Sequence, residues 1–122
     1  MTADMHMGHQ KVAEAFSSHR FSEVFPKMAA DVEWVAVGES TVRGRDAVIQ
    51  ACEAAAAEMG QITTEFTRFI SMAGPDAAAV DAIGRYVEAN GDTSVVSSCD
   101  VYEFANDQLS RITSYAVELP AE

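Results

Sequence analysis

One acid in the last third of the chain stands where it could do chemistry. Asp100 opens the segment DVYEF (residues 100–104), which reads as a strand. Because side chains on a strand alternate between its two faces, Asp100, Tyr102 and Phe104 point the same way. A carboxylate among aromatic rings is unfavourable unless it is paired or neutralised. Asp100 is therefore either a structural ion-pair partner or a working acid or base.

The turn Asn90-Gly91-Asp92 indicates which residues meet Asp100 across the sheet. Asn-Gly is typical of a β-hairpin turn, and counting outward from it places Asp100 near Ile83 on the neighbouring strand. Asp81 and Arg85 would then be diagonal neighbours of Asp100 on the same face, about 7–8 Å away at the backbone. Long side chains close such a gap, so these three charged groups are expected to converge.

Aromatic residues would complete a pocket around these charges. Tyr115 is expected to share the inner face with Asp100, and Trp34 is expected to form the opposite wall. The residues expected to contact a substrate are Trp34, Tyr102, Phe104, Tyr115 and Asp81. Asp100 and Arg85 are the expected catalytic pair. The alternative is an ion pair between these two that holds the strand register and contributes little else.

The elements that must position these residues divide into helices first and strands afterwards. Helical spacing covers residues 11–16, a short second helix is expected after Ser22, and residues 45–59 form the strongest helical pattern. The predicted strands are residues 31–37, 61–73, 78–89, 94–104 and 111–119. This segregation indicates an α+β fold, in which a long, curled antiparallel sheet is covered on its concave side by three N-terminal helices. His19, in the loop after the first helix, is expected at the surface.

Length, charge and cysteine content limit the class of protein. The 122 residues suit a single domain, of which residues 1–8, with His6, are expected to be flexible. The net charge of −11 argues against nucleic acid and anionic membranes as partners. No apolar run approaches the about 20 residues that span a bilayer. Cys52 and Cys99 match no metal or redox motif, and His9 is too isolated to indicate a metal site. We therefore expect a cytoplasmic protein without metal or cofactor.

The outer face of the predicted sheet is apolar. The residues expected to point away from Asp100 are Val95, Cys99, Val101, Ile112 and Ala116. An apolar face of this extent is usually covered by a partner, so we expect a homodimer.

Three segments together resemble a known family. They are ADVEW (residues 30–34) after the short second helix, GRDAV (residues 44–48) at the start of the long helix, and DVYEF followed by Ile112. In this order the chain resembles the SnoaL-like and ketosteroid-isomerase-like group of the nuclear-transport-factor-two-like superfamily. The resemblance implies a cone-shaped α+β fold and one SnoaL-like domain over residues 1–122.

The resemblance implies a role for one residue. Asp100 occupies the place of the ketosteroid-isomerase acid that donates a hydrogen bond to the substrate oxyanion. The acidic general base of those isomerases is missing, because Val35 and Ala36 stand near its position, and Val12 and Ala13 stand where the isomerases carry a tyrosine. Steroid isomerisation is therefore not expected.

Two functions remain open from the sequence. The first is a cofactor-independent acid/base enzyme (an isomerase, cyclase, dehydratase or hydrolase) that acts on a small hydrophobic organic molecule. The second is a non-catalytic module that binds a ligand or a protein in the same cavity.

Overall fold

The helices of the chain lie before or among the first strands, and the α+β fold class is confirmed. The computed structural model describes the backbone of residues 2–120 and the side chains of residues 8–120. Helix α1 (Thr2–Ser17) begins earlier than the 11–16 spacing predicts, and Met1 and the side chains of residues 2–7 lie outside the described part. The expected second helix is a pair of short 3₁₀ helices, η1 (Phe21–Glu23) and η2 (Phe25–Lys27).

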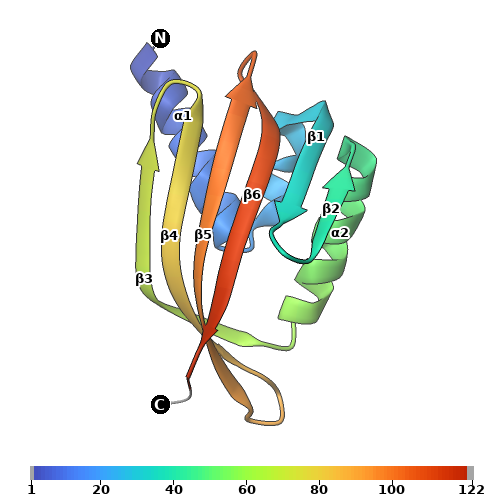
Figure 1. The fold of residues 1–122 in the computed structure, drawn as a ribbon, viewed down its shortest axis with the longest axis vertical. Coiled ribbons are helices and arrows are strands. Elements are labelled where there is room, and N and C mark those ends of the chain that lie inside the picture. The colour runs from blue at the N-terminus through green and yellow to red at the C-terminus, as the bar shows by residue number, and fades with distance from the viewer. Residues whose placement is uncertain (1, 121–122) are drawn as a thin grey trace.

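Six strands form one curled sheet behind which the helices pack (Figure 1). The strands are β1 (Met28–Ala36), β2 (Ser40–Arg43), β3 (Thr63–Ala73), β4 (Ala77–Val87), β5 (Thr93–Ala105) and β6 (Gln108–Leu119). They are ordered β2-β1-β6-β5-β4-β3 across the sheet. Strands β3 to β6 form the predicted antiparallel meander.

One strand pair departs from a wholly antiparallel sheet. β1 lies parallel to β6, with Trp34 opposite Ile112, whereas every other pair in the described sheet is antiparallel. The sheet is therefore mixed. Strands that are distant in the sequence, with no hairpin between them, leave no local turn signal from which their direction can be predicted.

The two long helices cover different parts of the sheet. α1 packs across β3, β4 and β5, and α2 (Arg45–Met59) packs against β1 and β2 (Figure 1). The expected long helix thus has the predicted bounds but covers the β1–β2 side of the sheet, and α1 covers the β3–β5 side. No helix of the described residues is long and apolar enough to cross a membrane.

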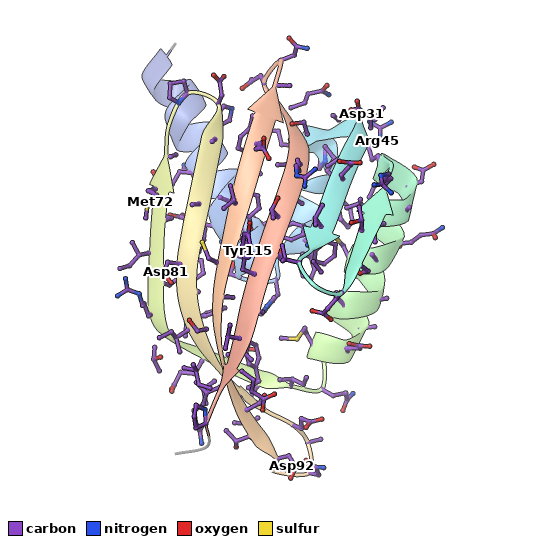
Figure 2. All side chains as sticks on the ribbon, viewed as in Figure 1. Asp31, Arg45, Met72, Asp81, Asp92 and Tyr115 are labelled. Carbon is purple, nitrogen blue, oxygen red and sulfur yellow. The ribbon has the colours of Figure 1, made fainter. Side chains whose placement is uncertain are left out.

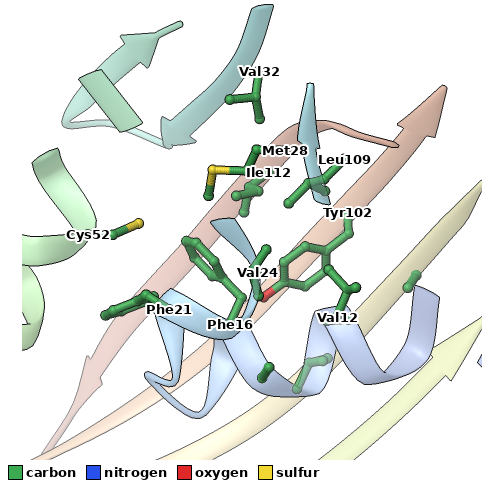
Figure 3. Packing of buried hydrophobic residues seen from close by; sticks show 14 of the residues in the cluster. Val12, Phe16, Phe21, Val24, Met28, Val32, Cys52, Tyr102, Leu109 and Ile112 are labelled. Atoms are coloured by element: carbon green, nitrogen blue, oxygen red, sulfur yellow. The ribbon is translucent and has the colours of Figure 1, made fainter. Parts of the chain in front are cut away.

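The core lies between α1 and the concave face of the sheet. Val12, Ala13 and Phe16 form the buried face of α1 that their spacing predicts. Tyr102 on β5 is fully buried against them, with its ring directed at α1 (Figure 3). Other buried members of this core include Leu109, Ile112, Val24, Met28, Val32, Val48 and Cys52.

The register of the β4–β5 hairpin differs from the predicted one. Its loop spans residues 88–92, where the Glu88 amide donates to the Asp92 carbonyl, and Asp100 pairs with Val80 rather than with Ile83. The observed and predicted registers differ by three residues, which is an odd number. Because side chains alternate, an odd shift moves each predicted neighbour to the other face of the sheet.

The β5–β6 turn forms without glycine. Asn106 and Asp107 have φ angles of 53° and 64°, in the left-handed region that these two residue types tolerate. The turn also holds a histidine from α1. His9 is only 4% exposed, stacks on Phe104 and lies 3.0 Å from the Asp107 carboxylate through Nε2.

Candidate functional site

A cavity of about 180 Å³ lies beside Asp100, between the end of α1 and the strands β1, β4, β5 and β6. Its polar lining consists of Ser17, His19, Ser98, Asp100 and Ser114. Its aromatic lining includes Phe16, Phe21, Trp34 and Tyr86. One carboxylate with several hydroxyls among aromatic rings is a common composition for a small-molecule site.

Asp100 is held by the end of α1. The Ser17 hydroxyl donates a hydrogen bond of 2.7 Å to Oδ2 of Asp100, and the Tyr102 hydroxyl lies 3.5 Å from the same oxygen. No protein hydrogen bond engages Oδ1 in the part of the chain that the structure describes. The carboxyl group is therefore anchored through one oxygen.

Tyr102 supports this anchor from the core. Its hydroxyl oxygen lies 2.5 Å from Ser17 Oγ. Burial, and next the Asp100 charge, raise the pKa of Tyr102 above its ordinary value, so this hydroxyl keeps its proton. Tyr102 and Phe104 share the face of Asp100 as predicted, but neither lines the cavity. Both are core residues, because α1 covers this part of β5.

Asp81 and Arg85 lie on the opposite face of the sheet from Asp100, and the predicted charged triad is wrong. Asp81 pairs in register with Cys99 and forms an ion pair of 3.0 Å with Arg68. In Figure 2 the Asp81 side chain lies on the face away from α1. The odd register shift of the β4–β5 hairpin is the cause, and it excludes the ion pair between Asp100 and Arg85 as well.

Tyr115 is also on the outer face. It pairs with Cys99, and its side chain is 49% exposed on the side away from α1 (Figure 2). Tyr115 is nevertheless among the residues that line the cavity, together with its neighbours Ser114 and Ala116. Ser114, which pairs with Asp100, is on the inner face.

Trp34 stands in the cavity wall, where its position on β1 predicts it. Its indole Nε1 donates a hydrogen bond of 3.0 Å to Ser114 Oγ. Its ring meets Phe16 edge to face, with ring centroids 5.1 Å apart. These two contacts hold the indole in one orientation beside the polar groups.

His19 lines the cavity rather than the surface. Its φ of 70° is left-handed, which directs the chain back from the end of α1 toward η1. The imidazole lies among aromatic rings, 5.9 Å from Phe21, Phe66 and Tyr86 between centroids. Burial lowers the pKa of His19, and the Asp100 charge acts in the opposite and smaller sense. The imidazole is therefore neutral at pH 7.

Sequence reasoning missed five polar residues of this site: Ser17, His19, Tyr86, Ser98 and Ser114. In the sequence, Ser17 and His19 look like the end of a helix. The signal that they line a cavity is their position directly after the buried stripe of α1. The positions of Tyr86 and Ser114 in the cavity can be predicted only when the strand register is known. No group of three metal-ligating side chains occurs among the described residues.

Comparisons with known proteins identify the family and the fold. A model of the SnoaL-like domain matches residues 9–112. An NTF2-like protein of unknown function from Cytophaga hutchinsonii is 31% identical, with a TM-score of 0.81 over 93% of this chain and 99% of that chain. A comparison with curated proteins gives no significant match.

Two solved structures with named activities share the fold at lower identity. A candidate polyketide cyclase from Xanthomonas campestris pv. campestris is 18% identical, with a TM-score of 0.72 over 94% of this chain and 92% of that chain. An LEH-like epoxide hydrolase from M. tuberculosis is 15% identical, with a TM-score of 0.65 over 95% of this chain and 84% of that chain. With its family match, its cone-shaped α+β fold and its 31% identical NTF2-like relative, the chain belongs to the SnoaL-like domain family.

Proposed function

We propose that the cavity beside Asp100 binds a small, largely apolar organic molecule and that Asp100 exchanges a proton with it without a cofactor. The unequal use of the two carboxylate oxygens carries this proposal. Ser17 engages Oδ2, whereas Oδ1 has no protein partner among the described residues. A carboxylate that is anchored by one oxygen and free at the other can accept a proton from a bound molecule with little reorganisation.

The reaction classes follow from where the proton goes next. Asp100 returns it to another atom of the same molecule in an isomerisation or a cyclisation. In a dehydration it delivers the proton to a leaving hydroxyl, and in a hydrolysis it takes the proton from water. The relatives named as a polyketide cyclase and an epoxide hydrolase support these classes by fold alone. In this proposal His19 and Tyr86 assist Asp100, which is the role that the sequence predicts for Arg85.

The test is proton exchange on a simple carbon acid. Cyclohexanone in D₂O loses its α-protons to solvent, and the rate is followed by ¹H NMR with and without protein. We expect the wild type to accelerate this exchange, or to open the epoxide cyclohexene oxide, and Asp100→Asn to do neither. The Asn side chain keeps an oxygen that can accept the Ser17 hydrogen bond, so Asp100→Asn should fold. This variant is therefore the control for the loss of the carboxylate. If the wild type and Asp100→Asn act alike, the catalytic proposal fails.

A second function keeps the cavity but not the chemistry. The absence of an acidic base at Val35 and Ala36 favours a module that only binds a ligand. Its signature is binding of cyclohexanone by the wild type and by Asp100→Asn, with no acceleration of exchange by either protein.

We also propose that the protein is a homodimer that works in the cytoplasm. The outer sheet face exposes large apolar side chains, including Met72 and Val117, which a second copy would cover. Cys52 and Cys99 are both free thiols, as expected in a reducing compartment.

A further inference from the structure

Gly84 makes room for the ring of Tyr86. A β-carbon on Gly84 would lie 2.8 Å from the Tyr86 hydroxyl oxygen and 2.9 Å from its Cζ, closer than any side chain tolerates. The tyrosine ring therefore lies back along β4, directly over the glycine. Glycine in a strand often marks a place where another group approaches the backbone closely. Here the approaching group is a tyrosine hydroxyl that lines the cavity.

Tyr86 and Asp100 stand toward opposite ends of this cavity. Val96, Ser98 and Asp100 follow one another along the inner face of β5, and Val96 pairs with Gly84 beneath the Tyr86 ring. Asp100 is four residues along β5 from Val96, so the α-carbons of these two residues are about 13 Å apart at about 3.3 Å per residue. A ligand between the two groups meets a hydroxyl donor at one end and a carboxylate at the other.

The Tyr86 hydroxyl is free to donate. Within residues 8–120 no protein acceptor lies at hydrogen-bond distance from it. Its environment also keeps it protonated, because burial and then the Asp100 charge raise the pKa of Tyr86. A half-buried hydroxyl without a partner gains most from a ligand that brings an acceptor.

The cavity volume matches a ligand of about one ring. An engineered protein cavity of about 150 Å³ binds benzene, and sites for drug-sized molecules begin at about 300 Å³. The volume here is about 180 Å³. A four-ring steroid or polyketide would extend out of this space through its open side.

We infer that the ligand is a neutral molecule of one-ring size with a single hydrogen-bond acceptor, that Tyr86 donates to this acceptor, and that Gly84 sets the position of Tyr86. The inference rests on the proposed function only in placing the ligand in the same cavity. It excludes anionic ligands, because Asp100 is the one carboxylate of the lining and would repel them.

The test measures binding with matched probes by NMR titration. Cyclohexanone carries the acceptor, and methylenecyclohexane has the same shape without it. Removing the Tyr86 hydroxyl in Tyr86→Phe should weaken cyclohexanone about 3- to 10-fold, the range expected for one hydrogen bond, and leave methylenecyclohexane unchanged. Equal changes for the two probes would overturn the role of Tyr86.

Gly84→Ala tests the positioning role without removing any functional group. Its methyl group displaces the Tyr86 ring, so this variant should also weaken cyclohexanone, and combining it with Tyr86→Phe should add nothing further. Gly74→Ala is the matched control, because a β-carbon there meets only the Ala77 carbonyl oxygen at 4.0 Å. Additive losses in the double variant would refute the coupling of Gly84 to Tyr86. Should Gly84→Ala not fold, Tyr86→Phe still decides the role of the hydroxyl.

Two further probes test size and charge. The fused two-ring ketone 2-decalone and the anion cyclohexanecarboxylate should each bind the wild type at least 10-fold more weakly than cyclohexanone. Asp100→Asn should recover binding of the anion but not of the larger ketone. Tight binding of 2-decalone would overturn the size limit. All of these readouts are affinities, so a protein that binds as described but exchanges no protons would refute the proposed catalysis and leave this inference standing.

Discussion

The hydroxyl oxygens of Ser17 and Tyr102 lie 2.5 Å apart, although 85 positions separate the two residues in the sequence. The single Ser17 proton is directed at Asp100, so the Tyr102 hydroxyl is the donor in this contact. Tyr102 is fully buried on β5 and Ser17 ends α1. The core therefore holds the serine, and the serine holds the carboxylate at the edge of the cavity.

Ser17→Ala should destabilise the protein by about 1–3 kcal/mol, because it leaves the buried Tyr102 hydroxyl without its close acceptor. Urea denaturation at pH 7 measures this free energy of unfolding. Ser18→Ala is the control for loss of a hydroxyl at the same helix end, since Ser18 bonds only to the backbone of α1 and to the exposed Arg20.

The double variant of Ser17→Ala and Tyr102→Phe shows whether the two hydroxyls act as a pair. Removing both partners leaves no orphaned polar group, so the double variant should lose less stability than the sum of the single variants. Additive losses of stability in the double variant would contradict the chain of hydrogen bonds from Tyr102 through Ser17 to Asp100.

Stability should fall at mildly acidic pH because of His19. Its pKa is lower in the folded protein than the value of about 6.5 in the unfolded chain, so the unfolded chain binds this proton more tightly. The stabilising contribution of the neutral imidazole is complete above about pH 6.5 and is lost as pH falls through the folded pKa.

Denaturation of the wild type and of His19→Asn between pH 8 and pH 5 isolates this contribution. Asparagine tolerates the left-handed backbone at this position and does not titrate. The difference in stability between the two proteins should shrink or reverse in sign toward pH 5. Two curves that stay parallel would show that His19 is not buried as described.

The fold could be predicted from the sequence, because its elements are marked locally. The apolar stripe of α2, its termination at Gly60, and the left-handed turn at Asn106 and Asp107 each depend on a few neighbouring residues. The parallel pairing of β1 with β6 depends on packing between distant segments and has no such local mark.

The site could be predicted only in part, because it depends on strand register. Asp100 and Trp34 were identified from their own strands. The neighbours of Asp100 were not, since the Asn90-Gly91 turn sits within the five-residue loop 88–92 rather than in a tight two-residue turn. An odd error in register replaces every cross-strand neighbour by one from the other face. The register predicted from the sequence therefore places Arg85 in the cavity, where the structure has Tyr86.

Only Tyr86→Phe, and not Arg85→Ala, should weaken binding in the cavity, although the two residues are adjacent. Arg85 is on the outer face, so its removal should leave cyclohexanone affinity and proton exchange within about twofold of the wild type. Tyr86→Phe should weaken cyclohexanone binding as inferred above. If Arg85→Ala reduced the rate of proton exchange as much as Asp100→Asn does, Arg85 would be part of the site.

The outer sheet face should form the interface of a homodimer. Its membership differs from the predicted one, because Ile112 and Ala116 lie on the inner face and Ile112 is fully buried. The large apolar side chains exposed on this face are Ile70, Met72, Tyr115 and Val117. Beside them, Met72, Ala79 and Val101 line a hollow of about 280 Å³ that can receive side chains of a second copy. An apolar face shared by two copies of one chain forms a symmetric contact.

Light scattering at micromolar concentration should give twice the chain mass of 13.1 kDa for the wild type. Val117 is 63% exposed and belongs to the contact as we propose it, so Val117→Glu should give the mass of one chain, since a dimer would bury two like charges without partners. Ala54→Glu is the matched control, because Ala54 is exposed on α2, away from this face, and the same charge there should leave the dimer intact. A wild-type mass of 13.1 kDa, or a Val117→Glu protein that stays dimeric, would place the apolar face outside any interface between copies.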